Sequence, residues 1–362
     1  MVKKIYSIIK GSGCYIPKKK ILNKNFLDHV FYDAEGNKIS TPNSETINKF
    51  EKITEIRERR YVEKDLNASD IAYFAAEDAI KNSGVDKESF DYIIVAHNFG
   101  DVLDANRVSD SVPSLASRVK HRLGIENPKT IAYDVHFGCP GWLLAMIQAD
   151  YFIKSGDSKR ILVIGTETLS RICDPHDRDS MIYSDGAGAT ILEGIESDVP
   201  VGIISHASRS DTLDHAYLLW MGKSNNPAYK GEELFMKMNG RKLYEYALNN
   251  VPMVVKDSLD KANIDLEEVH KVLIHQANTK MDDAILSRIF KLYDKVAIDI
   301  PKYIMPMTIA EYGNSSVATI PTLLSLIFND QFKDHTVKKG NILVFASVGG
   351  GMNINSMVYK VH

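Results

Sequence analysis

The sequence predicts an α/β protein built from two related halves. Around Cys139, an apolar run (130–135) stops at a turn, a helix that is apolar on nearly all sides continues to residue 155, and a second apolar run covers 160–165. Short apolar runs indicate buried strands, and a helix that is apolar all round indicates a buried position. The same order of elements returns 179 residues later. This repetition predicts two halves, each with a mainly parallel sheet.

The elements before the Cys139 turn are expected to alternate between helices and strands. Residues 1–9 predict a first strand, because their apolar stretch is too short and too interrupted for a signal peptide. Residues 11–13 and Pro17 then indicate a loop, and the polar, turn-rich segment 32–44 is typical of an insertion or the edge of a lid. The other expected elements are helices over 45–60, 68–83 and 113–123, a strand over 90–96 and a polar loop over 98–111.

The repeat aligns residues 75–96 with residues 254–275 without a gap. The turn at 312–316 then corresponds to the turn at 137–141, and an apolar helix and an apolar strand follow each of them. Four matching elements in the same order make chance similarity a poor explanation. The second half is therefore expected to begin near residue 196.

Composition excludes several classes of protein. Of the 362 residues, 44% are hydrophobic and 25% charged, which indicates a globular chain, and the net charge of -3 gives no electrostatic argument for binding nucleic acid or a membrane. No apolar run approaches the roughly 20 residues of a spanning helix. Three cysteines make no disulfide framework, which predicts a reducing cytoplasm. No cluster has the spacing of metal ligands.

Cys139 is a candidate nucleophile because it lies in the turn that opens the buried helix. Free backbone N–H groups and the positive end of a helix lower a thiol pKa, so this position is expected to favour the thiolate. The alternative is that a lone cysteine is simply a small buried hydrophobic residue. For Cys14 and Cys173 we prefer that alternative.

The repeat supplies two possible partners for Cys139. Ligands of open α/β sheets bind beyond the carboxyl ends of the strands. His275 follows the apolar run 272–274, and Asn314 occupies the turn equivalent to that of Cys139. Taken singly, the histidine can be structural and the asparagine can be a helix cap. Their equivalent positions instead predict a common pocket for Cys139, His275 and Asn314.

Motifs spread along the chain resemble the β-ketoacyl-acyl carrier protein synthase III family of the thiolase superfamily. The motifs lie at residues 56–60, 173–178, 184–189, 238–241, 275–278, 312–316 and 349–351. The resemblance implies the five-layered αβαβα thiolase fold, made of two pseudo-twofold-related halves. The first, residues 1–195, would carry the nucleophilic cysteine, and the second, residues 196–362, the histidine and asparagine. It also implies a homodimer and a site that needs no cofactor or metal.

The resemblance further implies a reaction on acyl thioesters. Cys139 would take the acyl group, since a thiolate is both a nucleophile and a leaving group. Malonyl-acyl carrier protein would then lose carbon dioxide, and the side chains of His275 and Asn314 would donate hydrogen bonds to the resulting enolate. The backbone N–H groups of Cys139 and Gly350 would bind the tetrahedral oxyanion of the condensation.

The implied acyl pocket contains Val112, Phe137 and Trp142. In short-chain members of the family, a phenylalanine at the position of Val112 reaches across the dimer and closes the pocket. The smaller Val112 leaves room for several methylene groups, so we expect medium, long, branched or oxidised acyl chains rather than acetyl. The small residue at position 112, the large Phe137 and Trp142 beside the cysteine turn and the segment 32–44 together favour a specialised-metabolite branch of the family over an initiator of fatty acid synthesis.

The residues implied for binding coenzyme A or pantetheine are Arg178, Asn239, Gly240 and Tyr244. The tryptophan that stacks on adenine in the family is missing from residues 48–53, so the acyl donor is either coenzyme A or a carrier protein. Carrier proteins are acidic, and Lys280 matches a basic docking position of the family. The alternative for Lys280 is an ordinary solvated helix face, on which Arg288 and Lys291 also lie.

Three other functions remain open. An acyltransferase of the same fold would form an ester or amide, but it has less need of the His275 and Asn314 donors. A non-catalytic ketosynthase-like subunit would typically lack the nucleophile that Cys139 provides. A 3-hydroxy-3-methylglutaryl-type synthase needs a glutamate base, and Glu167, which follows a strand, is interpreted as structural.

Overall fold

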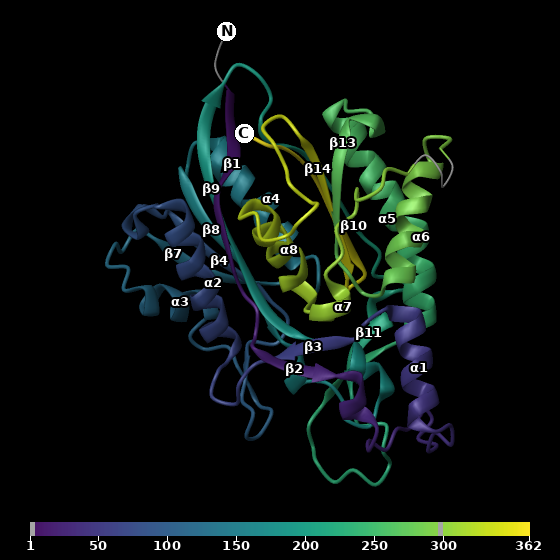
Figure 1. Ribbon diagram of the computed structural model, residues 1–362. Coiled ribbons are helices and arrows are strands. Elements are labelled where there is room, and N and C mark those ends of the chain that lie inside the picture. The colour runs from purple at the N-terminus through teal and green to yellow at the C-terminus, as the bar shows by residue number, and fades with distance from the viewer. Residues whose placement is uncertain (1–3, 296–299) are drawn as a thin grey trace.

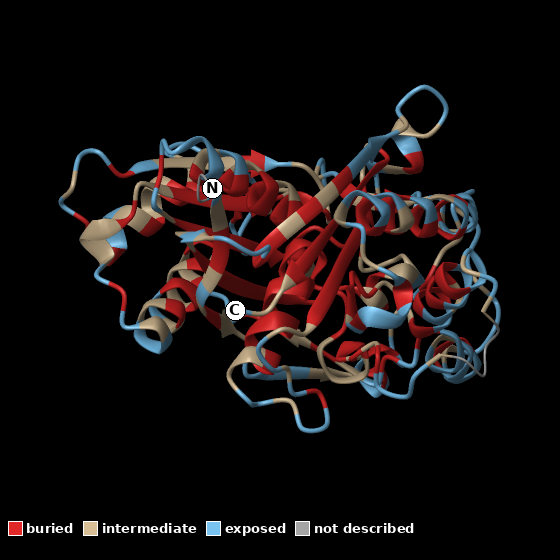
Figure 2. Ribbon diagram, turned by 90° about the horizontal axis from the view of Figure 1, so that it is seen from above, coloured by how far each residue is buried: buried red, intermediate tan, exposed pale blue. Residues whose placement is uncertain are grey.

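A computed structural model describes residues 4–295 and 300–362 of the chain. Two sheets lie face to face with helices between them and on both outer sides, which gives five layers in the order α, β, α, β, α (Figure 1). The five-layered thiolase-like architecture is therefore as predicted. Buried residues concentrate on the strands and on the helices between them, whereas the loops around them are exposed (Figure 2).

The first sheet has five strands in the order β1-β9-β8-β4-β7. The strands are β1 (Lys4–Tyr15), β4 (Tyr92–His97), β7 (Ile131–His136), β8 (Arg160–Thr168) and β9 (Asp185–Ser197). Strand β4 pairs parallel with both β7 and β8, but β9 pairs antiparallel with β8 and β1.

The second sheet has four strands in the order β10-β15-β14-β13. These are β10 (Gly202–Ser210), β13 (Val269–Ile274), β14 (Ile342–Gly349) and β15 (Asn353–Lys360). Its one parallel pair among the described strands is β13 with β14. Both sheets are mixed, because in each of them one strand, β9 or β15, runs opposite to all the others. The expected parallel direction holds for the remaining strands.

Each layer of helices covers a separate hydrophobic core. The helices are α1 (Asn43–Thr54), α2 (Ala68–Ser83), α3 (Leu115–Leu123), α4 (Gly141–Ser155), α5 (Gly240–Ala262), α6 (Thr279–Lys291), α7 (Ile309–Tyr312) and α8 (Thr319–Phe328). Helices α2 and α3 cover the outer face of the first sheet, and α4 and α8 lie between the sheets. Among the described residues, no helix is long and apolar enough to cross a bilayer.

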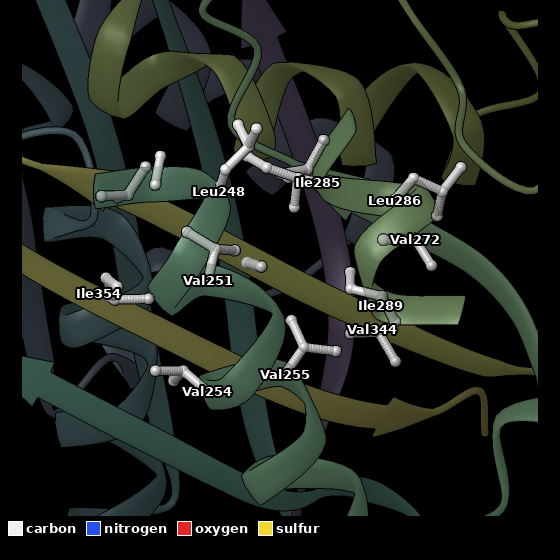
Figure 3. Packing of buried hydrophobic residues seen from close by; sticks show 14 of the residues in the cluster. Leu248, Val251, Val254, Val255, Val272, Ile285, Leu286, Ile289, Val344 and Ile354 are labelled. Atoms are coloured by element: carbon white, nitrogen blue, oxygen red, sulfur yellow. The ribbon is translucent and has the colours of Figure 1, made fainter. Parts of the chain in front are cut away.

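The outer face of the second sheet shows how one of these cores is built. Aliphatic side chains of α5 and α6, such as Val251 and Ile289, pack onto Val272, Val344 and Ile354 of the sheet (Figure 3). The repeat is visible here, since α5 ends at Ala262 and α2 at Ser83, the offset of 179 expected from the sequence.

Three short strand pairs lie outside the main sheets. They are β2 (Lys19–Leu22) with β3 (Glu58–Tyr61), β5 (Asp101–Val102) with β6 (Ser109–Asp110), and β11 (Leu219–Gly222) with β12 (Phe235–Met238). Two predictions change as a result. The helix expected over 45–60 ends at Thr54, because Glu55 adopts a left-handed conformation (φ 60°) and the chain continues into β3. The loop expected over 98–111 contains the β5–β6 hairpin.

The loop predicted at residues 11–13 is wrong, because β1 runs through them to Tyr15. The glycines are needed there for close packing rather than for a turn. A Cβ at Gly13 would contact the backbone nitrogen of Ala79 and would lie 2.6 Å from the backbone oxygen of Ala75. Glycine in this strand therefore lets α2 approach the sheet at backbone distance.

The segment 32–44 forms a small turn closed by a bridge between Tyr32 and Lys38. The backbone N–H of Tyr32 donates to the oxygen of His176 at 2.9 Å, which ties the segment to the loop before Arg178. The segment does not line the cavity described below. A role as a lid stays a prediction.

The contact at Gly13 predicts a stability change. Gly13→Ala should lower the free energy of unfolding by about 1 to 3 kcal/mol, since the added methyl group forces α2 away from the sheet. Urea unfolding followed by circular dichroism measures the change. Lys10→Ala, at an exposed position of the same strand, should stay within about 0.5 kcal/mol of the wild type. Superimposable curves for Gly13→Ala and wild type would contradict the packing argument.

Candidate active site

A cavity of about 330 Å³ opens where strands of both sheets end. Its wall contains the three predicted residues Cys139, His275 and Asn314, together with Gly350. The strand-end rule therefore places groups from both halves of the chain in one cavity. Other residues of the wall are Asn98, Phe137, Gly138, Tyr183, Leu219, Met221, Met236, Met238, Leu243, Met281, Ser316 and Gly349.

Cys139 lies in the turn between β7 and α4. Gly138 precedes it with φ 72°, a left-handed conformation that favours glycine, and accepts a hydrogen bond from Gly141 N at 2.9 Å. The cysteine faces the narrow, largely apolar cavity, and this burial raises the pKa of its thiol to about 11. The expected low thiol pKa is therefore not found, because desolvation by burial outweighs the hydrogen bonds from Ser316 and from the Cys139 backbone.

The cysteine turn touches the glycine run that follows β14. A Cβ at Gly349 would lie 2.7 Å from Cys139 N, and one at Gly138 would lie 2.9 Å from Gly350 N. Side chains at these positions would push the two turns apart. Their absence lets the two turns touch, and Cys139 and Gly350 both line the cavity.

His275 follows β13 and is 4% exposed. Its backbone N–H donates to Ala346 O on β14 at 2.9 Å, which fixes the residue against the sheet. Burial lowers the pKa of the imidazole to about 4, so it is neutral at pH 7. Nδ1 has no hydrogen-bond partner within the described residues. The Ser316 backbone forms a hydrogen bond with the ring, and a neutral imidazole can donate through one nitrogen and accept through the other.

Asn314 is held by its backbone on both sides. Its N–H donates to Ile182 O at 2.9 Å, and its oxygen accepts from Ser184 N at 2.8 Å. Its side-chain oxygen accepts from Ser316 N at 2.8 Å. Because Oδ1 is engaged in this way, the amide Nδ2 is left to donate to a group in the cavity.

The rest of the cavity wall is mostly apolar and rich in methionine. The wall has four methionines. Met221, Met236 and Met238 lie on the β11–β12 hairpin, and Met281 lies on α6. Flexible thioethers adapt to ligands of different shape. Phe137 also lines the cavity, as the pocket prediction requires.

Two predicted pocket residues lie elsewhere in this chain. Trp142 is 1% exposed and packs against Phe345 in the core between the sheets, so its assignment to the acyl pocket is wrong. The reason is its place on the inner side of α4, one turn beyond Cys139. Val112 is 84% exposed and does not contact the cavity of its own chain. Its role in a partner's pocket stays a prediction.

The residues predicted to bind coenzyme A or a carrier protein lie outside the cavity. Arg178 and Asn239 are exposed, and Asn239 caps α5 by accepting from Lys242 N at 3.3 Å. Gly240 and Tyr244 follow on α5, and Lys280 is exposed on α6. The cavity residues Met238, Leu243 and Met281 are their neighbours in sequence. Asn239, Gly240, Tyr244 and Lys280 therefore stand near the cavity wall, whereas Arg178 has no such neighbour. The binding roles of all five stay predictions.

Arg288 is not a free docking cation. Its guanidinium donates to Leu248 O at 3.0 Å and to Asn249 Oδ1 at 2.5 Å. Among the described residues, no group of three His, Cys, Asp or Glu side chains could hold a metal ion. The cysteines Cys14, Cys139 and Cys173 are all free thiols.

Sequence analysis does not identify Ser316 or Asn98 as residues of the site, and it interprets Glu167 as structural only. Ser316 donates a hydrogen bond from its hydroxyl to Cys139 Sγ at 3.1 Å. Asn98, directly after β4, donates from Nδ2 to Ser316 Oγ at 3.0 Å. Glu167, near the end of β8, accepts from Asn98 N. The rule that sites lie beyond strand ends, applied to β4 and β8, would have found the last two.

Two family models match the chain, and together they span half of it. Residues 133–212 match the model described as 3-oxoacyl-[acyl-carrier-protein (ACP)] synthase III. Residues 259–361 match the model of the C-terminal part of the same synthase. The first segment contains Cys139, and the second contains His275 and Asn314.

Solved structures share the fold over the whole length. The 3-oxoacyl-[acyl-carrier-protein] synthase III of Aquifex aeolicus VF5 is 28% identical with a TM-score of 0.78, and the match covers 98% of this chain and 99% of that one. The β-ketoacyl-[acyl carrier protein] synthase III of Thermus thermophilus is 26% identical, with a TM-score of 0.80 and the same coverage. OleA of Xanthomonas campestris, solved with lauric acid and lauroyl-CoA, is 18% identical (TM-score 0.75) over 99% of this chain and all of that one.

The burial of His275 predicts a pH dependence of stability. Its pKa of about 4 in the folded state lies below the 6.5 of an exposed imidazole, so the unfolded chain binds more protons between these values. This contribution is present above pH 6.5 and is lost as the pH falls toward 4. Between pH 7 and pH 5, His275→Gln should lose about 2 kcal/mol less unfolding free energy than wild type.

Urea unfolding at the two pH values measures this difference, and all other titrating groups cancel in the comparison. His121→Gln, at an exposed position of α3, is the matched control and should follow the wild type. Equal losses in His275→Gln and wild type would show that the imidazole is not desolvated in the folded protein.

Proposed function

Because the chain belongs to the 3-oxoacyl-[acyl-carrier-protein] synthase III family, we propose that it catalyses acyl transfer to Cys139 followed by decarboxylative condensation with a malonyl thioester. The observation that carries this proposal is the single cavity lined by a thiol, a neutral imidazole and an oriented amide. Each of these groups has a different chemical task.

The first step forms an acyl-enzyme. The sulfur of Cys139 attacks the carbonyl carbon of an acyl thioester, a new C–S bond forms, and the bond to the carrier thiol breaks. The thiol proton of Cys139 leaves with the carrier sulfur. The tetrahedral intermediate places a negative oxygen beside the backbone nitrogens of Cys139 and Gly350, and their approach across the glycine contact supports this use.

The second step makes the carbon–carbon bond. A malonyl thioester enters the same cavity and loses carbon dioxide, and the electron pair moves onto the thioester as an enolate. Asn314 donates from Nδ2 to the enolate oxygen, and the neutral His275 supplies the second hydrogen bond. The enolate carbon then attacks the acyl group on Cys139, and the sulfur leaves.

The lining of the cavity supports a sizeable acyl group. The methionine-rich hairpin and the small Val112 both favour medium, long, branched or oxidised chains over acetyl. We propose that the donor is an acyl-CoA or acyl-acyl carrier protein, that no resident cofactor or metal takes part, and that the product belongs to a specialised pathway. Arg178, Asn239, Gly240 and Tyr244 would bind the pantetheine arm or coenzyme A.

We further propose a cytoplasmic homodimer that receives its extender from acyl carrier protein. Strand β7 is the edge of the first sheet, and Val112 and Val108 project from the loop beside it with 84% and 56% exposure, which favours burial against a second copy. Lys280 is an exposed cation beside the cavity residue Met281, as a docking site for an acidic carrier requires.

The catalytic roles predict separate losses. Cys139→Ala should abolish the acyl-enzyme, observed as added mass on the intact protein. Asn314→Ala and His275→Ala should retain part of the acylation but lower carbon dioxide release by about 100-fold to 1000-fold, because each removes an oxyanion donor. Release from malonyl thioester is measured directly.

The same experiment separates the alternatives. Condensation at the wild-type rate in Asn314→Ala would refute the assigned roles. Transfer of the acyl group to an alcohol or amine without carbon dioxide release would favour the acyltransferase. Absence of acyl-enzyme with every thioester would favour a non-catalytic subunit.

The proposed place of Val112 in a partner's pocket predicts a change of selectivity. Val112→Phe should lower the rate of acylation by octanoyl relative to acetyl thioester by about tenfold or more, since the larger ring fills space for several methylene groups. Val108→Phe, on the same loop, should keep the wild-type ratio. Faster acylation of the wild type by acetyl thioester than by octanoyl thioester would refute the proposed pocket.

A further inference from the structure

The thiol of the half-buried Cys139 is desolvated and needs a donor that favours the thiolate. Its burial in the apolar cavity raises the thiol pKa, and the largest opposing contribution is the hydrogen bond from Ser316. Ser316 lies in the Asn314 turn, in the other half of the chain, and reaches the sulfur across the cavity. A hydrogen bond to an anion is about twice as strong as one between neutral groups.

The orientation of the Ser316 hydroxyl is set by its neighbour. Asn98 Nδ2 is a donor, so the 3.0 Å contact with Ser316 Oγ uses a lone pair of the hydroxyl oxygen. The hydroxyl has a single proton, which is therefore left for Cys139 Sγ at 3.1 Å. Asn98 therefore donates to Ser316, and Ser316 donates to the sulfur of Cys139.

Glu167 holds Asn98 in place. The backbone N–H of Asn98 donates to Glu167 Oε1, and the Asn98 side chain also interacts with this carboxyl group. Glu167 is 2% exposed and lies near the end of β8, the parallel neighbour of β4 that Asn98 follows. Burial raises the pKa of Glu167 to about 8, so at pH 7 it fixes Asn98 without a full negative charge beside the sulfur.

We infer that Ser316 is a further catalytic residue, whose hydroxyl stabilises the Cys139 thiolate, and that Asn98 and Glu167 are the residues that position it. This inference rests on the proposed function, in which Cys139 is acylated. In the acylation step Ser316 keeps its own proton. It donates to the sulfur while the thiol proton leaves, and the hydrogen bond weakens once the sulfur is bonded to the acyl carbon.

Other titratable or charged groups lie near these contacts. Asp185 on β9 faces Glu167 and raises its pKa, and Arg171 lies beside Asp185. Tyr183 and His275 share the cavity with Cys139. None of these groups is altered in the variants below, so differences between variants report on the hydrogen bonds that lead from Asn98 through Ser316 to Cys139.

The test measures alkylation of Cys139 by iodoacetamide from pH 6 to pH 10, with peptide masses that separate Cys14 and Cys173. Ser316→Ala should lower the alkylation rate of Cys139 by about tenfold at each pH, and acylation by thioesters should fall to a similar extent. Ser316→Gly provides a second variant that suits the positive φ of 51° at this residue. Ser315→Ala, in the same turn and outside the cavity lining, should keep wild-type rates.

Two further variants test the positioning residues. Asn98→Asp replaces a donor by an acceptor of the same shape, so the Ser316 proton turns toward it and the alkylation rate should fall about as far as in Ser316→Ala. Glu167→Gln still accepts from Asn98 but cannot ionise. It should match wild type at pH 7 and be alkylated several-fold faster above pH 8, where wild-type Glu167 becomes charged.

The outcomes separate the inference from the function it rests on. Normal acylation of wild-type Cys139 with unchanged alkylation and acylation in both Ser316 variants would overturn the inference and leave the proposed function standing. If Cys139 in Glu167→Gln were alkylated at the wild-type rate at every pH, Glu167 would have only a structural role, and its assignment as a positioning residue would be overturned. Failure of the wild type to acylate would overturn both.

Discussion

The contact between two glycine-containing turns is the constraint on which the site depends. Backbone touches backbone where the Gly138–Cys139 turn meets Gly349 and Gly350, and a single Cβ at Gly138 or Gly349 would separate them. One turn ends a strand of the first sheet and the other ends a strand of the second. The distance between the two halves at the cavity is therefore fixed by main-chain atoms, and side chains from both halves can meet around one sulfur.

Most of the fold could be predicted from patterns of apolar residues and helix ends. The repeat at 179 residues predicted the paired helices α2 and α5, and Gly156 ends α4 where expected. The reversed direction of β9 and β15 could not be predicted, because these strands have the same apolar pattern as their neighbours. The glycines near residue 13 predict a loop, but in the structure they allow α2 to pack closely on β1. Glycine is favoured both in turns and at close contacts with a helix, so the sequence does not distinguish the two.

The site could be predicted where chemistry and position coincided. Cys139, His275 and Asn314 are reactive types that lie directly after strands or at equivalent turns, and they line one cavity. Ser316 and Asn98 are common polar residues, and nothing in their type indicates that they contact a sulfur. Trp142 was misplaced because the direction of a side chain around a helix start depends on the turn before it. The high thiol pKa of Cys139 depends on burial, which spacing alone does not reveal.

The proposed reacting groups and most of the cavity methionines stand on different parts of the framework. The former follow strands of the two main sheets, whereas three of the four cavity methionines belong to the β11–β12 hairpin, which pairs with neither sheet. Side-chain volume on the hairpin can change without disturbing the register of any sheet strand. Under the proposed function, substitutions on the hairpin would change the choice of acyl group without altering the groups that carry out the reaction.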